Sequence, residues 1–319
     1  MSNEQRLDEN NGSIDDSEFQ ILEQFAIRLA KESGAKLLDH FLKPIEVEYK
    51  TGGDRDPVTI ADKESEDFIR AQILKEYPDH AIIGEEGENH GSDAARFAWV
   101  IDPLDGTSNF INHIPIWACS IGLLLHGKPV VAAIYLPPTQ ETEGRVVHAR
   151  YGGGAFIDGE AITVASNPTP NRGRLTIFPA YYWRMYKFRS PLRGGVGTIR
   201  SLGSTAFEMA GVASGMFQYG IFNPPSIWDI GAGILLVQEA GGVVMSLRRR
   251  RGPWQHLQSI VGKSGNVPTL KEIQGWREPV LAGNPRIAQF IAKNTTQRPR
   301  YLMRLRRYWA ERKSRSATK

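Results

Sequence analysis

Residues 99–110 read WVIDPLDGTSNF, an apolar run that ends in two carboxylates with a glycine and a hydroxyl directly behind them. The apolar residues that open the stretch are typical of a buried strand. Pro103 restricts the backbone after Asp102, and the resulting turn can aim Asp102 and Asp105 at one point. The carbonyl of Leu104 can turn toward the same point. This stretch therefore predicts a polar site at the end of a buried strand.

Acidic residues accompany an apolar element at three further places in the chain. In α/β folds, ligands bind at the ends of strands and the starts of helices. Taken singly, each acid has a plain explanation as a turn residue, a helix cap or part of a solvated loop. Together, at four separate elements, they predict one shared site. The stretches are IIGEEG with Glu85 and Glu86, SIWDIGAG with Asp229, and DPVTIAD with Asp56 and Asp62.

The residue types in these stretches favour a particular metal. Carboxylates that share a site repel one another and raise each other's pKa, and a divalent cation removes that cost. Oxygen ligands without His or Cys favour Mg²⁺, with Mn²⁺ as the alternative, over Zn²⁺. The chain has seven His and one Cys, none in a pair with zinc-ligand spacing, which counts against a zinc site. Because Mg²⁺ keeps positions for water and phosphate oxygens, a phosphate ester is the expected ligand.

The residues after Asp105 indicate where a phosphate group would bind. We expect Asp105 to cap a short helix, so that the backbone amides of Gly106 and Thr107 point outward. A helix N-terminus of this kind attracts anions. Metal ligands and a phosphate cradle would then lie within one turn of each other. This arrangement predicts metal-assisted phosphoryl transfer with water as the acceptor.

The rest of the chain alternates between helical and strand patterns. Apolar residues at a spacing near 3.6 predict a helix over 17–43, with a bend near Gly34, and a second helix over 59–77. Between residues 117 and 164, β-branched residues punctuated by Gly and Pro predict several antiparallel strands. Such a mixture predicts an α/β (α+β) fold in which layers of helices alternate with mixed sheets. The later strands are expected at 175–180, 217–222, 243–247 and 279–283, and the later helices at 205–215, 228–242 and 285–293.

Composition and cysteine usage bound the class of protein. The chain has 319 residues, of which 41% are hydrophobic and 23% charged, as in a globular protein. Its single cysteine, Cys119, cannot form an intrachain disulfide, so a reducing, cytoplasmic location is predicted. Because Cys119 lies in an apolar run, it is expected in the core. The first residues do not have the pattern of a signal peptide. The longest apolar run, at 119–125, is far shorter than the roughly 20 residues of a membrane span.

Basic residues are concentrated at the end of the chain. From Arg298 onward there are nine Lys and Arg residues against one acid, and without them the net charge changes from +4 to −4. The chain before Arg298 is mildly acidic and, outside residues 248–251, shows no broad basic stretch that could line a nucleic-acid groove. This counts against a nuclease or polymerase. The terminal stretch can form a basic amphipathic helix that contacts an acidic membrane surface, a nucleic acid or a partner, or a loosely docked solvated helix. A non-catalytic binding or regulatory protein that uses this tail is the alternative of another class.

The predicted organisation is one large domain with two extensions. The domain is expected to divide into a half that carries the metal and phosphate residues and a half that carries the substrate residues. The second half is interrupted by an insertion without a clear period. The expected divisions are a disordered N-terminus at 1–16, the catalytic domain at 17–295 with halves at 17–150 and 151–295, an insertion near 248–277, and the basic tail at 296–319.

Two basic segments have more than one interpretation. The arginine run at 248–251 is expected to be a solvated loop, with an interaction or oligomer surface as the alternative. The segment at 180–195 is rich in aromatic and basic residues. It either forms part of a pocket or lid, or covers a sheet, and its pattern does not distinguish these roles.

Four motifs in order make the chain resemble the inositol monophosphatase family of lithium-sensitive, magnesium-dependent phosphatases. The opening stretch at 99–110 is similar to the family's first signature, and WDIGAGILLVQEAGG at 228–242 resembles its second. DPVTIAD at 56–62 and IIGEEG at 82–87 match in order and at suitable distances. The resemblance covers residues 17–293. It implies the layered sandwich of that family and the activity of a phosphoric monoester hydrolase, and a homodimer is expected.

The resemblance also implies roles for individual residues. Thr107 and Asp62 would orient and deprotonate the attacking water, and Glu85 would help to hold a weaker third ion through water. Mg²⁺ is the implied cofactor, as two or three ions, and Li⁺ is expected to inhibit. The implied ligands are Glu85, Asp102 and the Leu104 carbonyl for the first ion, and Asp102, Asp105 and Asp229 for the second. The residues implied to bind phosphate and substrate are Gly106, Thr107, Ser108, Arg200, Gly203 and Ser204.

The resemblance is less specific for the substrate than for the chemistry. Members that act on inositol phosphates carry a Glu shortly before the Trp-Asp motif, whereas YGIFNPPSIWD at 219–229 has no acid before Asp229. We therefore expect a Mg²⁺-dependent phosphomonoesterase that hydrolyses a small phosphorylated metabolite, a polyol, sugar or related phosphate, by attack of a metal-activated water. The alternatives within the superfamily are a fructose-1,6-bisphosphatase, a histidinol-phosphatase and a 3′-phosphoadenosine nucleotide phosphatase.

Overall fold

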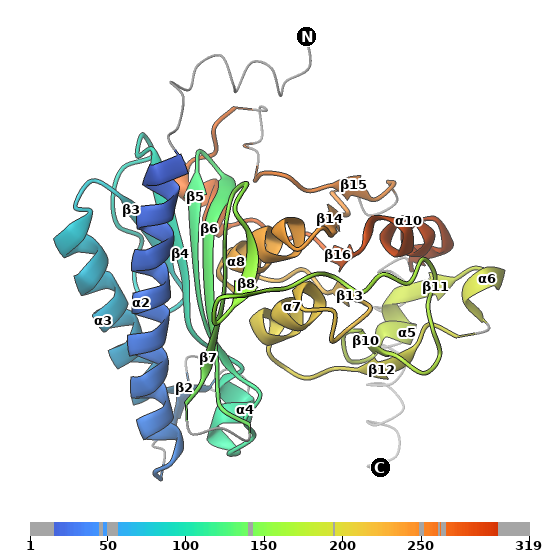
Figure 1. Ribbon diagram of the computed structural model, residues 1–319, viewed down its shortest axis with the longest axis horizontal. Helices are drawn as coiled ribbons and strands as arrows, with labels where there is room; N and C mark the ends of the chain where they lie inside the picture. The colour runs from blue at the N-terminus through green and yellow to red at the C-terminus, as the bar shows by residue number, and fades with distance from the viewer. Residues whose placement is uncertain are drawn as a thin grey trace, which may run out of the picture.

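The structure is a computed structural model that describes residues 16–44, 47–49, 57–139, 143–193, 195–248, 252–260, 262 and 266–298. The described part of the molecule is built from two large mixed sheets, two small two-stranded sheets and the helices that cover the large sheets (Figure 1). The helices are α2 (Asp16–Phe41), α3 (Ile60–Glu76), α4 (Thr107–Ile111), α5 (Tyr182–Met185), α6 (Ser190–Arg193), α7 (Thr205–Ala213), α8 (Ile227–Glu239), α9 (Leu270–Gln274) and α10 (Pro285–Asn294). The strands are β1 (Val47–Tyr49), β2 (Pro57–Thr59), β3 (Ala81–Gly84), β4 (Phe97–Asp105), β5 (Ala118–Leu125), β6 (Lys128–Leu136), β7 (Arg145–Arg150), β8 (Gly154–Ile157), β9 (Glu160–Ala161), β10 (Leu175–Ile177), β11 (Tyr186–Phe188), β12 (Thr198–Arg200), β13 (Tyr219–Phe222), β14 (Val243–Ser246), β15 (Gln255–His256), β16 (Val280–Gly283) and β17 (Thr295–Gln297).

Helices and sheets alternate through the molecule (Figure 1). The larger sheet has seven strands in the order β3-β4-β5-β6-β7-β8-β9, parallel between β3 and β4 and antiparallel elsewhere. The second has six strands in the order β12-β10-β13-β16-β14-β15. Helices α2 and α3 cover the outer face of the larger sheet, α7 and α8 pack between the sheets, and α10 covers the far face of the second. The expected fold of alternating helical and sheet layers is confirmed.

The apolar residues form three cores that correspond to these layers. Along β4, Trp99 and Ile101 are buried against α2 and α3, whereas Ala98 and Val100 are buried on the face that α7 and α8 cover. This alternation follows from the period of two in a strand. A third core joins the second sheet to α10. Because β4 is buried on both faces, the charged residues at its end are held in a rigid, apolar frame.

Two of the helices begin with an acid that also caps the helix. In α3, the backbone N–H of Thr59 donates to Asp62 Oδ2 over 2.7 Å, and the Thr59 hydroxyl donates to the same oxygen over 2.6 Å. In α8, the N–H of Ser226 donates to Asp229 Oδ2 over 2.8 Å. Both acids occupy the third helical position, as in a capping box. The start of each helix therefore fixes the orientation of an acid that the sequence assigns to the site.

Two details differ from the sequence-based expectation, and Gly34 has a further role. Helix α2 is continuous through Gly34, and this glycine makes room for a neighbour: a Cβ there would lie 2.2 Å from the Tyr135 ring. The expected insertion contains β15 and α9, and the Leu270 N–H donates to Asp93 Oδ1 over 2.7 Å, so the segment packs against the loop after β3. The boundary expected between 295 and 296 falls inside β17, which pairs with β11.

The segment at 180–195 forms α5, β11 and α6, with residue 194 outside the described residues. Tyr186 and Leu192 are buried in the core that α10 and the second sheet share. This placement favours the interpretation that the segment covers the sheet. The predictions for the N-terminus before Asp16, for Asp56, for most of the arginine run and for the tail beyond Arg298 lie outside the described residues.

The buried position expected for Cys119 is confirmed, because its side chain is fully buried on β5. Burial raises the pKa of its thiol to about 12, which keeps it protonated at neutral pH. In the described part of the chain, none of the helices combines the length and apolar character needed to cross a membrane.

The close contact between α8 and β4 gives a first testable prediction. A Cβ on Gly231 would lie 2.6 Å from Cγ2 of Val100. Alanine favours a helix by about 1 kcal/mol over glycine, yet we expect Gly231→Ala to lower the free energy of unfolding by about 1–3 kcal/mol through overpacking. Adding Val100→Ala removes the clashing methyl, so the double variant should be more stable than the two single changes predict. Urea unfolding of all four proteins measures this coupling; strictly additive changes would contradict the contact.

Candidate active site

The candidate site is centred on Asp102, near the end of β4. The register between β4 and β5 shifts between Asp102 and Asp105, which gives Pro103 and Leu104 room to turn. The Leu104 N–H donates to Asp102 Oδ1 over 3.1 Å and holds this carboxyl in the turn. Asp102 is 1% exposed, and its carboxyl lies close enough to those of Glu85 and Asp229 to interact with both, so that a shared proton or a cation is needed between them. The structure thus brings together three acids that lie far apart in the sequence.

Sheet pairing places Glu85 beside Asp102. Strand β3 runs parallel to β4, and its last residue, Gly84, is opposite Ile101. Glu85 directly follows Gly84, and Asp102 directly follows Ile101. Because parallel strands end at the same edge of a sheet, their side chains meet there. The sequence shows two apolar runs ending in acids, and the parallel pairing explains why these two ends coincide.

Asp105 is held differently from the sequence-based expectation. The short helix α4 has Gly106 at its N-cap, with a φ of 96° and without a side-chain hydrogen bond at the cap. Oδ2 of Asp105 instead accepts hydrogen bonds from the Ser204 hydroxyl over 2.8 Å and the Ala206 backbone N–H over 2.5 Å. The expectation that Asp105 caps the helix after it is therefore wrong. It joins β4 to the N-terminus of α7, where backbone N–H groups need acceptors.

Thr107 and Asp62, which the resemblance paired, lie within hydrogen-bond distance of each other beside this centre. The Thr107 hydroxyl lies 3.3 Å from Asp62 Oδ1 and 3.1 Å from the Leu104 carbonyl oxygen, and it can donate to either. Asp62 is 1% exposed, and burial raises its pKa to about 6 despite the hydrogen bonds that it accepts from Thr59. A carboxylate of this kind can accept a proton near neutral pH.

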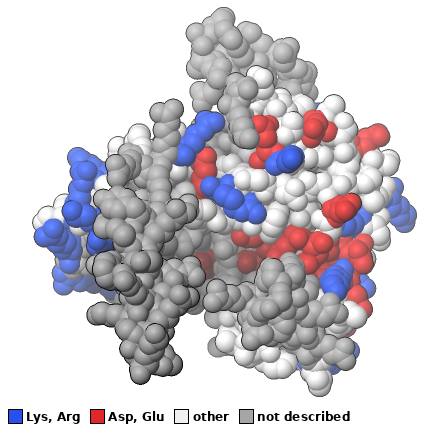
Figure 2. All heavy atoms as spheres, turned by 180° about the vertical axis from the view of Figure 1, so that it is seen from behind, with Lys and Arg blue, Asp and Glu red and all other residues white. Residues whose placement is uncertain are grey.

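The electrostatics of the centre are dominated by buried negative charge. Burial and then the neighbouring charge of Glu85 raise the pKa of Asp102 well above its ordinary value, and burial and then Asp229 do the same for Asp105. Burial raises the pKa of Asp229 to about 6. Figure 2 shows acidic side chains gathered in a band across one face of the molecule. Such crowding is costly unless protons or a cation reduce the repulsion.

The donor set determines which metal these residues fit. Among the described residues, no three His, Cys, Asp or Glu side chains meet the geometry of a ready-formed metal site. The acids of the centre instead contact one another directly. Their donors are oxygen atoms only, and a divalent cation among them would offset their mutual repulsion. On this chemistry the residues fit Mg²⁺ or Mn²⁺.

The residues expected to bind phosphate and substrate do not all reach the centre. Ser204 caps α7 and contacts Asp105. Gly203 lies beside it with a φ of 85°, a conformation that favours glycine. Ser108 is exposed on α4. Arg200 is exposed at the edge of the second sheet, and in the described region its guanidinium donates to the Ile199 carbonyl and to none of the acids of the centre.

The structure reveals supporting residues that sequence reasoning missed. The Asn109 side chain donates to the carbonyls of Ile116 and Leu202, each over 2.7 Å, and so joins the two halves of the domain. Glu208 accepts the Leu202 N–H over 2.6 Å. A single acid in the apolar helix TAFEMAG was the signal for Glu208. Glu66 lies one turn after Asp62 on α3, and this spacing was its signal.

Known proteins resemble the chain over most of its length. A model of the inositol monophosphatase family matches residues 19–277. A fructose-1,6-bisphosphatase/inositol-1-monophosphatase of Aquifex aeolicus is 35% identical over 224 residues, 67% of this chain and 81% of that protein. An inositol monophosphatase of Dictyostelium discoideum is 32% identical over 290 residues, 86% and 95% of the two chains. The extragenic suppressor protein suhB from Bartonella henselae has a structure that superposes with a TM-score of 0.66 at 27% identity, covering 84% of this chain and 95% of its own.

Glu208 leads to a prediction about pH. Burial raises its pKa from 4.5 to about 7. A carboxyl whose pKa is higher in the folded chain than in the unfolded chain loses stabilising effect as the pH rises through that window. Glu208→Gln keeps an acceptor oxygen without a charge. Its free energy of unfolding, relative to that of the unaltered protein, should therefore rise by up to about 3 kcal/mol between pH 5 and pH 8.

Urea unfolding at both pH values tests this prediction. Glu239→Gln is the matched control, because Glu239 likewise accepts backbone N–H groups, from Gly152 and Gly154, but is only partly buried. An E208Q variant whose stability stays parallel to that of the unaltered protein would contradict the assignment.

Proposed function

The chain belongs to the inositol monophosphatase family, and we propose that it is a Mg²⁺-dependent phosphomonoesterase acting on a small polyol, sugar or related phosphate. Membership in this family makes it a phosphoric monoester hydrolase. The observation that carries the proposal is the meeting of Glu85, Asp102 and Asp229, which come from three separate elements. Their contact favours catalysis over the non-catalytic binding role that the basic tail suggested.

The proposed ion sites use the acids of the centre. Glu85, Asp102 and the Leu104 carbonyl would hold one Mg²⁺, and Asp102 would share a second with Asp105 and Asp229. A weaker third ion would contact Glu85 through water. When bound, Mg²⁺ supplies positive charge that offsets the negative charge developing on the phosphoryl oxygens. Mn²⁺ is the alternative ion, and Li⁺ the expected inhibitor.

Thr107 and Asp62 are proposed to handle the proton of the attacking water. When the Thr107 hydroxyl donates to Asp62 Oδ1, its oxygen can accept a hydrogen bond from a water molecule. As the water oxygen attacks phosphorus, its proton passes to Thr107 Oγ1, and the Thr107 proton passes to Asp62. The bond between phosphorus and the ester oxygen breaks, and the leaving oxygen takes a proton from a solvent water molecule, so that the alcohol departs and inorganic phosphate remains. The raised pKa of Asp62, about 6, suits it to this exchange near neutral pH.

Phosphate and substrate recognition are assigned to the two segments that flank Asp105. The Gly106 and Thr107 amides, with Ser108, are proposed to bind the phosphate. Gly203 is proposed to face the substrate from the start of α7. Ser204, implied by the resemblance as a substrate residue, is fully buried and donates to Asp105, so it is proposed to act on the substrate side only by holding that acid. Arg200, at the exposed edge of the sheet, is proposed to contact a part of the substrate that extends away from the phosphate.

The substrate is proposed from what precedes Asp229. Strand β13 and the turn that leads to α8 contain no acid there, which counts against a strict inositol monophosphatase. Fructose 1,6-bisphosphate, histidinol phosphate and 3′-phosphoadenosine nucleotides are the alternative substrates. The homodimer and the cytoplasmic location are parts of the same proposal. Light scattering of the purified protein tests the dimer.

A phosphate-release assay tests the activity. We expect inorganic phosphate to be released from at least one of inositol 1-phosphate, fructose 1,6-bisphosphate, histidinol phosphate and 3′-phosphoadenosine 5′-phosphate. Release should require Mg²⁺, stop with EDTA and decrease with Li⁺, because the acids depend on a bound cation to reduce their repulsion. The absence of release from the whole panel in the presence of Mg²⁺ would refute the proposed function.

Asp105→Asn tests the assignment of one ligand. We expect the turnover number to fall by at least about 100-fold, since losing a group that only supports a metal ligand already costs about 10- to 100-fold. The amide oxygen can still accept from Ser204 and Ala206, so circular dichroism and the unfolding midpoint should change little. Asp158→Asn is the control, because this exposed hairpin acid pairs with Arg145 on β7. Turnover of D105N similar to that of D158N would disprove the role of Asp105.

A further inference from the structure

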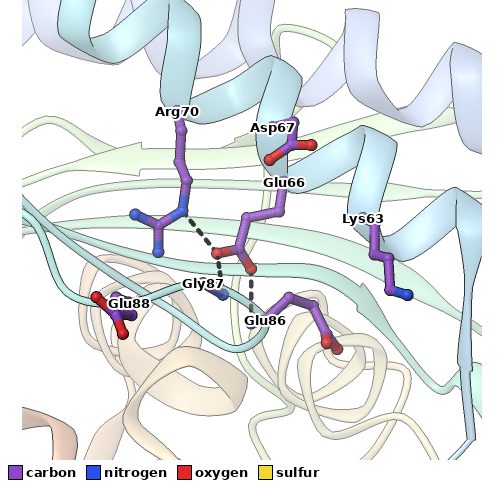
Figure 3. Close-up of a pocket in the computed structure, with 7 residues that line it drawn as sticks. All are labelled: Lys63, Glu66, Asp67, Arg70, Glu86, Gly87 and Glu88. Atoms are coloured by element: carbon purple, nitrogen blue, oxygen red, sulfur yellow. Dashed lines mark hydrogen bonds and ion pairs between the residues drawn. The ribbon is translucent and has the colours of Figure 1, made fainter. Parts of the chain in front are cut away.

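A small pocket beside the acidic centre lies between α3 and the loop after β3 (Figure 3). Figure 3 shows the Glu66 carboxylate pointing from α3 toward this loop, with the Arg70 guanidinium beside it. Glu66 is 2% exposed, so its charge is held away from water. A buried carboxylate is costly unless its oxygens are fully hydrogen-bonded. Its partners therefore indicate what the charge is used for.

The partners of Glu66 are the backbone just after the proposed metal ligand Glu85. Oε2 accepts the Glu86 N–H over 2.8 Å, and Oε1 accepts the Gly87 N–H over 2.8 Å. The Nε of Arg70 donates to Oε1 over 2.7 Å. One carboxylate thus holds two consecutive amides and is itself oriented by an arginine one turn away. Hydrogen bonds to a charged group are the stronger kind.

The glycines of the loop leave room for this pair. A Cβ on Gly84 would lie 2.2 Å from Glu66 Oε1, and a Cβ on Gly87 would lie 2.9 Å from the Arg70 guanidinium. Gly84 and Gly87 stand on either side of the Glu85-Glu86 pair. The motif GEEG is therefore explained by close approach of the backbone to Glu66 and Arg70 as well as by the acids between the glycines.

Glu85 is consequently fixed from both directions along the chain. Before it, Gly84 is held in register with Ile101 of β4. After it, the two amides are held by Glu66. Helix α3 also carries Asp62 one turn earlier, so the same helix positions the proposed base and the loop of a proposed ligand.

We propose that Glu66, oriented by Arg70, is a positioning residue that holds Glu85 where it binds the metal and so sets the metal affinity of the site. The inference rests on the proposed function. If Glu66 and Arg70 only stabilised the fold, changing them would lower stability without changing metal affinity in the folded protein. If they position Glu85, changing them lowers the metal affinity of protein that is still folded.

The test measures Mn²⁺ binding to the full-length protein by electron paramagnetic resonance, together with the Mg²⁺ concentration that gives half-maximal activity. Glu66→Gln replaces one acceptor oxygen with an NH₂ group that faces a backbone N–H. We expect its affinity for Mn²⁺ to fall about 10- to 100-fold, as for other groups that support a metal ligand. The Mg²⁺ requirement should rise by a similar factor, while the KM for substrate at saturating Mg²⁺ stays within about twofold.

The matched control is Glu23→Gln on α2. Glu23 is also 2% exposed, and it bonds to His148 Nδ1 over 2.8 Å and to Arg150 Nη1 over 3.2 Å, so the change again removes a buried charge from an ion pair. Its partners lie on β7. We expect E23Q to lower the unfolding midpoint without changing Mn²⁺ affinity. Arg70→Lys, which keeps the charge but loses the Nε–H, is the second variant in case E66Q does not fold, and should weaken Mn²⁺ binding at least threefold.

The outcomes separate this inference from the proposed function. If the unaltered protein neither binds Mn²⁺ nor requires Mg²⁺, the proposed function fails. If it binds and E66Q, or R70K in its place, binds Mn²⁺ as tightly, the positioning role is overturned while the proposed function stands. Equal losses of Mn²⁺ affinity in E66Q and E23Q would also overturn it, because the effect would then follow from lost stability.

Discussion

The crowding of negative charge around Asp102 is the constraint on which the rest of the structure depends. Moving a charge into an apolar interior costs several kcal/mol even after relaxation, and here several carboxyl groups share one interior. The fold meets this cost with an apolar frame on both faces of β4 and with hydrogen bonds to Asp62, Asp105 and Asp229 from caps and helix starts. The remaining repulsion is what a divalent cation at the proposed site would relieve.

The two halves expected from the sequence are joined at the site itself. Asp105, from the first half, binds the start of α7 in the second, and the Asn109 side chain reaches the carbonyl of Leu202. Neither half has a complete centre, because Asp229 lies in the second half and Asp102 in the first. The centre needs both halves because α7 and α8, which lie between the sheets, begin close to the end of β4. Ala206 at the start of α7 donates to Asp105, and Asp229 at the start of α8 interacts with Asp102.

The sequence predicted the parts of the site that depend on local pattern. Apolar elements ending in acids are visible in a short window, so Glu85, Asp102 and Asp229 could be assigned before any contact was known. The partner of Asp105 could not be, because Ser204 is 99 residues away and a local reading favoured a cap on the adjacent helix. The packing role of Gly34 could not be predicted for the same reason, since the Tyr135 ring that approaches it belongs to β6. The role of Glu66 was missed because an acid on a helix usually faces solvent.

The chemistry is easier to infer than the substrate, because the residues assigned to the two differ in how firmly the fold holds them. The residues proposed to bind metal and move protons are buried or partly buried. Asp62, Asp102, Asp105, Thr107 and Asp229 are each hydrogen-bonded to a backbone group, which limits their freedom to vary. Ser108 and Arg200, which are proposed to meet the substrate, are exposed and lie on a short helix and an edge strand. A change at these exposed positions would disturb the fold less than a change at the acidic centre, so their residue types say little about which substrate is bound. Glu66 and Arg70 belong with the constrained residues, because Glu66 holds the backbone amides that follow the proposed ligand Glu85.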